Sequence, residues 1–426
     1  MMNDQQGSEL PFSSRQLVPG QLGYRQLSYR QLGYSQPSGT QQHLVIGNRL
    51  LVTASLYLVL AFLFAAGATA IQLMYHHAQR PSPTTQAKLT SQTALIAPQV
   101  DRLLTNMVAH QQFSGSVLIA HDDQMLLSKG YGIADLDDHA PNTPHTRFYL
   151  GSTTKQFTAM AILILQERSK LHVGDQLCAY IAHCPPAWQP VTIHELLTHT
   201  SGIPQLNNSP LSYASPQAWI ASYDAIPLAF IPGREFSYCN ICYQILGYVV
   251  EQASGEPYSV FLQQAIFHPL QMRDTGFDPN YYSLPDHANG YASWQVKSVS
   301  LGWSVAPQWS FLFGSGLLYS TIEDLYRWDQ ALYTHTLISQ QSLDEAFTSY
   351  IASQYAGSSY GYGWFIAKAP APGHRLIWHD GRVDGFRTYI GRYLDDRVTI
   401  IVLSNLATVD ELALASSLEQ IVFVHA

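Results

Sequence analysis

The sequence predicts an α+β fold, in which an antiparallel sheet flanked by helices is interrupted by a mostly helical subdomain. Near both ends of the folded part, two largely apolar runs (115–121 with 125–131, and 387–393 with 398–403) flank a turn containing two consecutive aspartates. This pattern is typical of a β-hairpin. Between the two hairpins, the helical insertion at about 151–339 is rich in helical patterns, capped turns and loops. We therefore expect one sheet built from both ends and a cleft between it and the helical part.

Residues 1–45 differ in kind from the rest of the chain. Between Arg15 and Gln36 a five-residue unit recurs as QLVPG, QLGYR, QLSYR and QLGYS, in a segment rich in Gln, Gly, Ser and Tyr. A period of five matches neither a helix nor a strand, and this composition cannot bury a core. We interpret the segment as a disordered Gln-rich tail, with a binding arm as the alternative.

The next segment predicts a membrane anchor at 46–76. No charged residue occurs from 50 to 75, and a helix of that length crosses a hydrocarbon core. Four arginines precede it, which favours a single-pass protein with a cytoplasmic N-terminus and the remainder outside the cell membrane. The alternative is a cleaved signal, because Ala68-Thr69-Ala70 resembles a processing site and cleavage near Ala70 would give a secreted protein. Residues 77–93 are expected to be a linker.

Residues 94–426 are expected to form one domain. Apolar residues at helical spacing predict a helix at 94–112, and an amphipathic helix at about 409–423 closes the chain. The formal net charge is −8, the sequence pI is about 6.1, and Lys and Arg form no run. This charge pattern argues against binding of nucleic acid through a basic surface.

The four cysteines form two close pairs in the sequence. Export to an oxidising compartment would permit a disulfide between Cys178 and Cys184, with free buried thiols as the alternative. Cys239 and Cys242 have the C-x-x-C spacing of some redox and metal sites. No second cysteine pair with histidines at zinc-like spacing accompanies them, so we interpret both as small core residues and expect no metal.

Ser152 and Lys155 are the first candidates for chemistry. They open a helix that continues with seven consecutive apolar residues, so we expect that helix to be buried on all sides. Backbone N–H groups at its start favour negative charge near Ser152. Lys155 follows one turn later, and burial would lower its pKa until a neutral amine accepts the serine proton. The plain alternative is a capping serine followed by a surface lysine.

Two further short motifs follow along the chain. Tyr238 and Asn240 precede an apolar helix at 243–253, and these side chains can relay a proton and bind a substrate amide. His379-Asp380-Gly381 follows a short strand pattern. Each motif is weak alone, because a core tyrosine with a capping asparagine explains the first, and His172-Val173-Gly174 matches the second as a simple turn.

The order of the three motifs carries more weight than any one of them. S-x-x-K at 152–155, Y-x-N at 238–240 and H-x-G at 379–381 occur in sequence. The chain thereby resembles the penicillin-recognising serine hydrolases, in the branch of class C β-lactamases, D-alanyl-D-alanine carboxypeptidases, esterases and D-aminopeptidases. The resemblance extends over about 95–426 and includes four further stretches: HELLTHTSGIP (194–204), PGREF (232–236), PLQM (269–272) and GSGL (314–317). It implies the DD-peptidase/β-lactamase-like fold.

The resemblance also implies a mechanism without a metal or an organic cofactor. Ser152 would attack a carbonyl to form an acyl-enzyme, which water then hydrolyses. Lys155 and Tyr238 would handle protons, and either of them is a candidate for the principal base. Backbone N–H groups of Ser152 and Arg382 would form the oxyanion hole.

The third motif narrows the expected substrate. By the same resemblance, Asn240 would hold the acyl side of the substrate and His379 would line the cleft near the leaving group. The dedicated β-lactamases usually carry K-T-G here, and carboxypeptidases often have a hydroxyl residue at the position of Asp380. Two close carboxylates repel each other, so Asp380 is expected to disfavour carboxylate substrates unless Arg382 or Arg387 compensates.

We therefore expect an extracytoplasmic serine hydrolase that acts on an ester or on a D-amino-acid amide or peptide, with cell-wall peptides among the candidates. The alternatives are a D-alanyl-D-alanine carboxypeptidase, a β-lactamase, or a non-catalytic penicillin-binding receptor on the same fold. Two rival catalytic residues are less well supported. Ser359 lies in a G-x-S-x-G pattern without the apolar strand and helix that a nucleophile elbow requires. His199 could join a Ser-His-Asp triad, but in the family its stretch is a structural loop.

Overall fold

The computed structural model describes residues 83–206, 213–277, 284–294, 296–297, 307–355, 357–368 and 374–425, all within a compact unit that spans Pro81–Ala426. An eight-stranded antiparallel sheet runs through it in the order β2-β1-β14-β13-β12-β11-β10-β9. Its strands are β1 (Gly115–His121), β2 (Gln124–Tyr131), β9 (Ile351–Ala352), β10 (Ser358–Tyr360), β11 (Phe365–Lys368), β12 (Arg375–Val383), β13 (Phe386–Tyr393) and β14 (Val398–Ser404).

The two ends of the domain meet in the middle of this sheet. Strand β1 pairs with β14 in a register that sets Gly115 opposite Ser404 and His121 opposite Val398. The hairpins β1–β2 and β13–β14 lie where the apolar runs predict them, and every residue of β1 and β14 is buried. Because both faces of these central strands are covered, they consist mostly of apolar residues and do not alternate regularly with polar ones.

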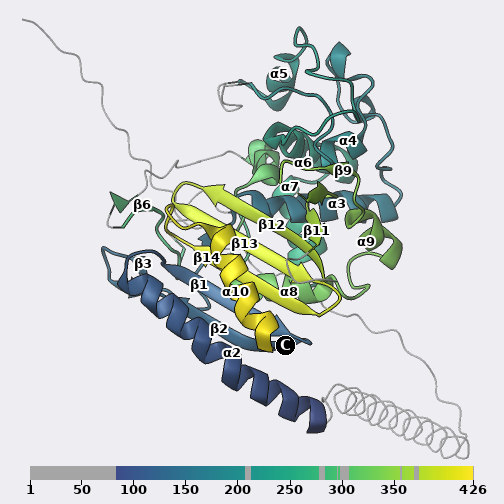
Figure 1. The fold of residues 1–426 in the computed structure, drawn as a ribbon. Helices are drawn as coiled ribbons and strands as arrows, with labels where there is room; N and C mark the ends of the chain where they lie inside the picture. The colour runs from purple at the N-terminus through teal and green to yellow at the C-terminus, as the bar shows by residue number, and fades with distance from the viewer. Residues whose placement is uncertain are drawn as a thin grey trace, which may run out of the picture. The chain divides into compact units, whose positions relative to one another are not determined.

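Two layers of helices cover the sheet. On one face lie α2 (Pro83–Ala109) and α10 (Glu411–His425), where Val100 and Leu418 belong to the same core as Val117 and Val402 of the central strands (Figure 1). The other face of these strands contributes Leu118 and other residues to a second core, shared with the helical subdomain. The chain therefore forms the antiparallel sheet with flanking helices that its sequence predicts.

The helical subdomain lies against one end of the sheet (Figure 1). Its central helix is α3 (Lys155–Glu167), in which every residue from Lys155 to Leu165 is buried, as the apolar run predicts. The remaining helices between β5 and β9 are α4 (Ile193–Leu197), α5 (Pro216–Ala221), α6 (Asn240–Ser254), α7 (Tyr258–Leu262), α8 (Ile322–Ala331) and α9 (Gln340–Ala346). Helix α6 ends at Gly255, whose φ of 79° is the left-handed conformation that glycine supplies at helix ends.

Short elements connect these layers. The paired short strands are β3 (Ile133–Asp135) with β4 (Ala140–Pro141), β5 (Phe148–Tyr149) with β8 (Tyr319–Ser320), and β6 (Tyr291–Ser293) with β7 (Val296–Lys297). Short helical turns are η1 (Gly151–Thr154), η2 (Leu177–Ala179), η3 (Pro186–Trp188), η5 (Gln263–Phe267) and η7 (Pro307–Ser315).

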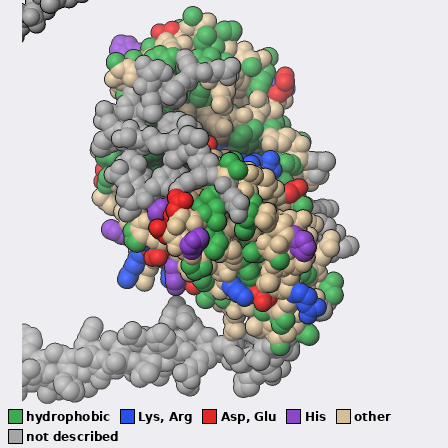
Figure 2. All heavy atoms as spheres, turned by 90° about the vertical axis from the view of Figure 1, so that its left-hand side faces the viewer, with side chains coloured by type: hydrophobic (Ala, Val, Ile, Leu, Met, Phe, Trp, Pro, Cys, Tyr) green, Lys and Arg blue, Asp and Glu red, His purple; other side chains and the backbone are tan. Residues whose placement is uncertain are grey.

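The N-terminal expectations have different outcomes. The linker expected at 77–93 is wrong from Pro83 onward, because the helix expected at 94–112 begins there and ends at Ala109. The tail at 1–45 and the anchor at 46–76 lie outside the described residues. Within the described ranges, no helix combines the length and the apolar character needed to cross a membrane. On the face in Figure 2, the described Lys and Arg side chains are scattered among acidic, histidine and apolar ones.

Candidate active site

Ser152 lies in the turn η1, which joins β5 to α3. Gly151 begins this turn with a φ of 54°, and a Cβ at that position would lie 2.6 Å from the backbone nitrogen of Arg382. Only glycine combines this conformation with so close an approach. Helix α3 then begins at Lys155, whose Nζ lies 3.0 Å from Ser152 Oγ. The S-x-x-K spacing thus brings the two side chains into direct contact, across a 3₁₀ turn rather than an α-helical one.

The amine of Lys155 is fully buried among acceptors. Its Nζ lies 2.8 Å from Asn240 Oδ1 and 2.7 Å from the carbonyl oxygen of Ser315, and 4.8 Å from the centre of the Tyr238 ring. Burial holds the pKa of Lys155 well below its usual range, while the charge of Asp380 partly opposes this effect. A neutral amine has two N–H bonds, which Asn240 and Ser315 can accept. Its lone pair is then left for the proton of Ser152.

Tyr238 lies in the loop just before α6, beside Ser152 and Lys155. Its hydroxyl is buried and has no hydrogen-bond partner among the described residues. Burial raises the pKa of Tyr238 well above its usual range, and the nearby Ser152 hydroxyl only partly opposes this. At neutral pH the phenol is therefore protonated, so its O–H can donate a hydrogen bond or relay a proton, but no phenolate is available to act as the base.

The strand β12 runs directly behind the nucleophile. A Cβ on Gly381 would lie 2.0 Å from the carbonyl oxygen of Leu150 and 2.4 Å from Thr388 Oγ1, so this position requires glycine. Thr388 donates a hydrogen bond of 2.7 Å to the same carbonyl. These contacts hold the backbone of residues 150–152 closely against that of Gly381 and Arg382, which the predicted oxyanion hole requires.

His379 does not line the cleft, contrary to the expectation from the sequence. The residue is 1% exposed, with Nδ1 2.6 Å from the carbonyl oxygen of Asp380 and Nε2 3.0 Å from the hydroxyl of Tyr360. Burial, and the charge of Lys155, lower the pKa of His379 to about 3. Because β10 and β11 continue the sheet beyond β12, the ring is covered and serves as a neutral structural group.

Asp380 does face the site. It lines a cavity of about 210 Å³ together with Ser152, Tyr238, Tyr355 and Arg382. Burial and the charge of Glu411 raise the pKa of Asp380 to about 6, while Arg382 partly opposes them. Arg382 Nε lies 2.6 Å from Glu411 Oε1 but 3.6 Å from Asp380 Oδ2.

The guanidinium of Arg382 thus lies closer to Glu411 than to Asp380, with which it forms only the longer ion pair. Among the described residues, the partners of the Asp380 carboxylate are its own backbone N–H and the more distant Arg382. Arg387 does not compensate either, because it bonds the carbonyl oxygen of Phe386. The acidic group of the H-x-G motif is therefore left available to a ligand.

A second cavity of about 320 Å³ meets the first at Ser152 and Arg382. Asn240 lines it, so the two residues of the Y-x-N motif reach different sides of the nucleophile. Its wall is part polar and part apolar, with Gln205, Gln244, Leu312, Leu317, Val383 and Asp384. No group of three His, Cys, Asp or Glu side chains able to hold a metal occurs among the described residues.

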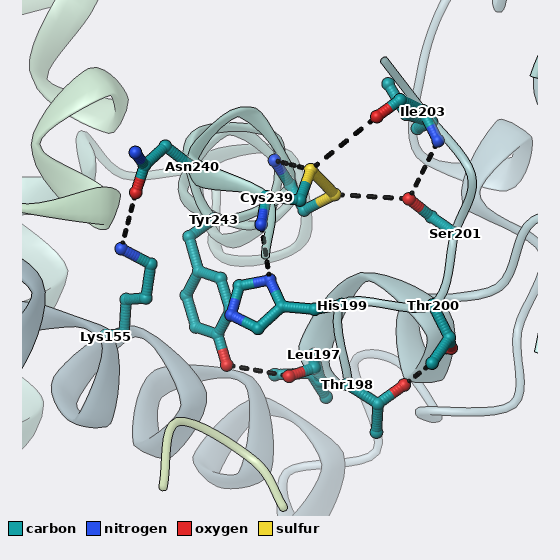
Figure 3. Close-up of a disulfide and its surroundings, with 11 residues drawn as sticks. Lys155, Leu197, Thr198, His199, Thr200, Ser201, Ile203, Cys239, Asn240 and Tyr243 are labelled. Atoms are coloured by element: carbon teal, nitrogen blue, oxygen red, sulfur yellow. Dashed lines mark hydrogen bonds between the residues drawn. A yellow bond between two sulfur atoms is a disulfide. The ribbon is translucent and has the colours of Figure 1, made fainter. Parts of the chain in front are cut away.

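Both cysteine pairs form disulfides. The expected bond between Cys178 and Cys184 is present. Cys239 and Cys242 are buried core residues, as interpreted, but they are also bonded to each other, which was not predicted from the sequence. Cys239 caps α6 and Cys242 lies in its first turn, which sets their Cα atoms 5.3 Å apart, within reach of a disulfide. This bridge encloses Asn240 (Figure 3).

The two rival catalytic residues lie away from the nucleophile, and one contact of the site was not foreseen. Ser359 lies in the short strand β10, where its hydroxyl contacts Ser349 and donates to the carbonyl oxygen of Ile366, so no strand–helix elbow exists there. The contact of Glu411 with Arg382 was not foreseen, because a glutamate at the start of a helix does not by itself indicate which residue it binds. His199 lies behind Tyr238 rather than beside Ser152.

Comparisons with known proteins agree with this geometry. The family model named Beta-lactamase matches residues 100–420. The penicillin-binding protein PbpX of Bacillus subtilis (strain 168) is 32% identical over 306 residues, covering 71% of this chain and 73% of that protein. A second penicillin-binding protein of the same strain is 31% identical over 332 residues, covering 73% of each chain. The solved octameric penicillin-binding protein homologue from Pyrococcus abyssi matches with a TM-score of 0.68 at 27% identity, over 77% of both chains.

Proposed function

The chain belongs to the beta-lactamase family of penicillin-binding and beta-lactamase-like serine hydrolases, and from this premise we propose that it hydrolyses an ester or a D-amino-acid amide or peptide outside the cell membrane. The observation that carries the proposal is the contact of 3.0 Å between Lys155 Nζ and Ser152 Oγ in a buried site. The two disulfides support the extracytoplasmic location, because such bonds persist in oxidising compartments. The anchor at 46–76 would hold the enzyme at the membrane.

In the proposed reaction Lys155 is the base. Ser152 Oγ attacks the substrate carbonyl and its proton passes to the lone pair of Lys155, since Asn240 and Ser315 occupy the two N–H groups of the neutral amine. The backbone N–H groups of Ser152 and Arg382 stabilise the oxyanion.

Tyr238 lines the cavity beside the nucleophile and is protonated at neutral pH. It gives its hydroxyl proton to the leaving group and takes the serine proton from Lys155, which returns to the neutral amine. Breaking the bond to the leaving group leaves the acyl group on Ser152 Oγ. Water hydrolyses this ester in a second round of the same proton transfers, and the free serine hydroxyl is restored.

Asp380 selects the substrate in this proposal. Above pH 6 its carboxylate is ionised and faces the cavity, and Arg382 is engaged by Glu411. A substrate carboxylate about 4 Å away would be repelled by about 4 kcal/mol in such a partly exposed cleft, whereas an ammonium group would be attracted. We therefore infer a preference for neutral esters and for substrates with a free amine over D-Ala-D-Ala peptides and β-lactams.

The test compares three substrates with the full chain: a p-nitrophenyl ester, D-alanine p-nitroanilide and nitrocefin. We expect turnover of the ester and the anilide that is lost in Ser152→Ala, and nitrocefin as the poorest substrate. Nitrocefin as clearly the best substrate would overturn the specificity. A fluorophosphonate that labels Ser152 without turnover of any substrate would instead indicate a non-catalytic receptor.

A matched pair of variants isolates Asp380. Asp380→Asn should raise KM for the anilide about 10-fold, equivalent to about 1.4 kcal/mol, and change KM for the ester by less than about 3-fold. Asp384→Asn removes the same charge from the other cavity and should change neither the KM for the anilide nor the KM for the ester. The same loss of affinity for the anilide should occur in the unmodified protein as the pH falls below about 6, because Asp380 then becomes protonated. Equal effects on ester and anilide would contradict this role.

A further inference from the structure

His199 lies at the centre of a buried aromatic cluster behind the candidate site. It follows α4 with a φ of 60° and is fully buried. Its ring centre lies 4.4 Å from that of Tyr238, 4.7 Å from that of Tyr360 and 5.0 Å from that of Tyr243. A histidine held this tightly between three tyrosines has one orientation available to it.

His199 binds the backbone on both sides of Tyr238. The N–H of Cys239 donates to Nδ1 of His199 over 3.0 Å (Figure 3). The N–H of Ser237 donates to the carbonyl oxygen of His199 over 2.9 Å. The N–H groups of the residues before and after Tyr238 are therefore both fixed by one residue about forty positions earlier in the chain. The ring of the same residue packs against the Tyr238 side chain.

The bond from Cys239 requires a neutral imidazole. Nδ1 can accept only when it carries no proton, which puts the hydrogen on Nε2. Nε2 has no hydrogen-bond partner among the described residues. The ring is therefore buried although this N–H is unsatisfied, which costs free energy.

The surroundings of the ring keep it neutral. Burial holds the pKa of His199 well below its usual range, and repulsion by Lys155 on α3 and His379 on β12, whenever either is protonated, acts in the same direction. The other titratable groups packed against the ring are the phenols of Tyr238, Tyr243 and Tyr360, whose pKa values burial raises. A neutral ring also adds no positive charge beside Lys155, which must itself be neutral to act as a base.

We propose that His199 is a positioning residue, which fixes the Tyr238 hydroxyl and the start of α6 with Asn240 relative to Ser152 and Lys155. This inference rests on the proposed function, because it assigns His199 to the proton transfer that Tyr238 performs there. A displacement of about 1 Å in such a group typically costs about 100-fold in rate. His199 itself need not touch the substrate.

The test uses two substitutions that differ in where they place an acceptor. In His199→Asn the amide oxygen takes the place of Nδ1, whereas in His199→Gln it takes the place of Nε2 and the Cys239 N–H loses its partner. We expect kcat for the p-nitrophenyl ester to fall about 100-fold in H199Q and less than about 10-fold in H199N, with KM within about 3-fold in both. Thermal unfolding of each variant checks that the fold is retained.

Two controls separate positioning from a general structural role. His194 on α4 bonds the hydroxyl of Tyr362 instead, so His194→Gln should leave kcat unchanged. If His199 acts through Tyr238, adding H199Q to Tyr238→Phe should lower kcat by less than about 3-fold further. Equal kcat for H199Q and H199N, or fully additive losses with Y238F, would overturn the inference. Absence of turnover in the unsubstituted protein would refute the proposed function instead.

Discussion

Replacing Gly381 by alanine tests whether β12 supports the oxyanion hole. The added Cβ would lie 2.0 Å from the carbonyl oxygen of Leu150, whereas ordinary contacts begin at 3.4 Å, so the two backbones must separate by about 1.4 Å. The clash is with a backbone atom and no side chain rotation relieves it. The separation carries the N–H of Arg382 away from that of Ser152.

The expected loss follows from this displacement. Removing one oxyanion donor typically lowers kcat by about 100- to 1000-fold, which equals about 2.7–4.1 kcal/mol of transition-state stabilisation. Overpacking of the strand should lower the free energy of unfolding by about 1–3 kcal/mol as well. The measurements are kcat for the p-nitrophenyl ester and urea unfolding of the full chain.

A second glycine provides the control for lost stability. Gly255 has a φ of 79° at the end of α6, and a Cβ there would meet nothing within 4 Å. Gly255→Ala should therefore lower the free energy of unfolding by about 1–2 kcal/mol through backbone strain without changing kcat. If Gly381→Ala folds and keeps kcat within about 3-fold of the original, Arg382 does not supply the oxyanion hole.

Two further predictions concern stability. The pKa of His379 is lowered to about 3, so between pH 8 and pH 5 this residue becomes protonated in the unfolded chain alone, which should reduce the free energy of unfolding by about 2 kcal/mol. In urea titrations at these two pH values, His379→Asn should lose about 2 kcal/mol less stability than the original protein. An equal loss in both proteins would refute the neutral burial of His379. Arg392, fully buried, lies 2.5 Å from Asp329 Oδ1, and Arg392→Met should cost about 3–5 kcal/mol in chemical unfolding because a buried carboxylate loses its partner. Arg392→Met combined with Asp329→Leu should recover part of that loss, and a double variant less stable than the single one would contradict this explanation.

The local patterns of the sequence predict the elements that depend on periodicity and spacing. The hairpins β1–β2 and β13–β14 follow from apolar runs around a polar turn, and the burial of α3 follows from its unbroken apolar run. The contact of Ser152 with Lys155 also follows from spacing, because residues one turn apart lie on the same side of a helix. In each case the interacting residues are close in the chain.

Only the tertiary structure decides which distant groups meet. His379 shares a motif with Asp380, yet the strands that continue the sheet cover its ring and leave Asp380 facing the cavity. Glu411, on the last helix, takes the closer contact with Arg382 and leaves Asp380 only a longer ion pair with the same side chain. His199 positions Tyr238 through hydrogen bonds to the neighbouring backbone, and the sequence around either residue does not predict these bonds.

The sequence by itself determined the fold class, the S-x-x-K pair and the order of the three motifs, because periodicity, spacing and order are properties of the chain alone. The tertiary structure decided the second disulfide, the burial of His379 and the pKa of Asp380, because each depends on atoms that packing brings together. The sequence therefore shows that an aspartate occurs at position 380, but only the fold determines the pKa, and hence the charge, of its carboxylate beside the nucleophile.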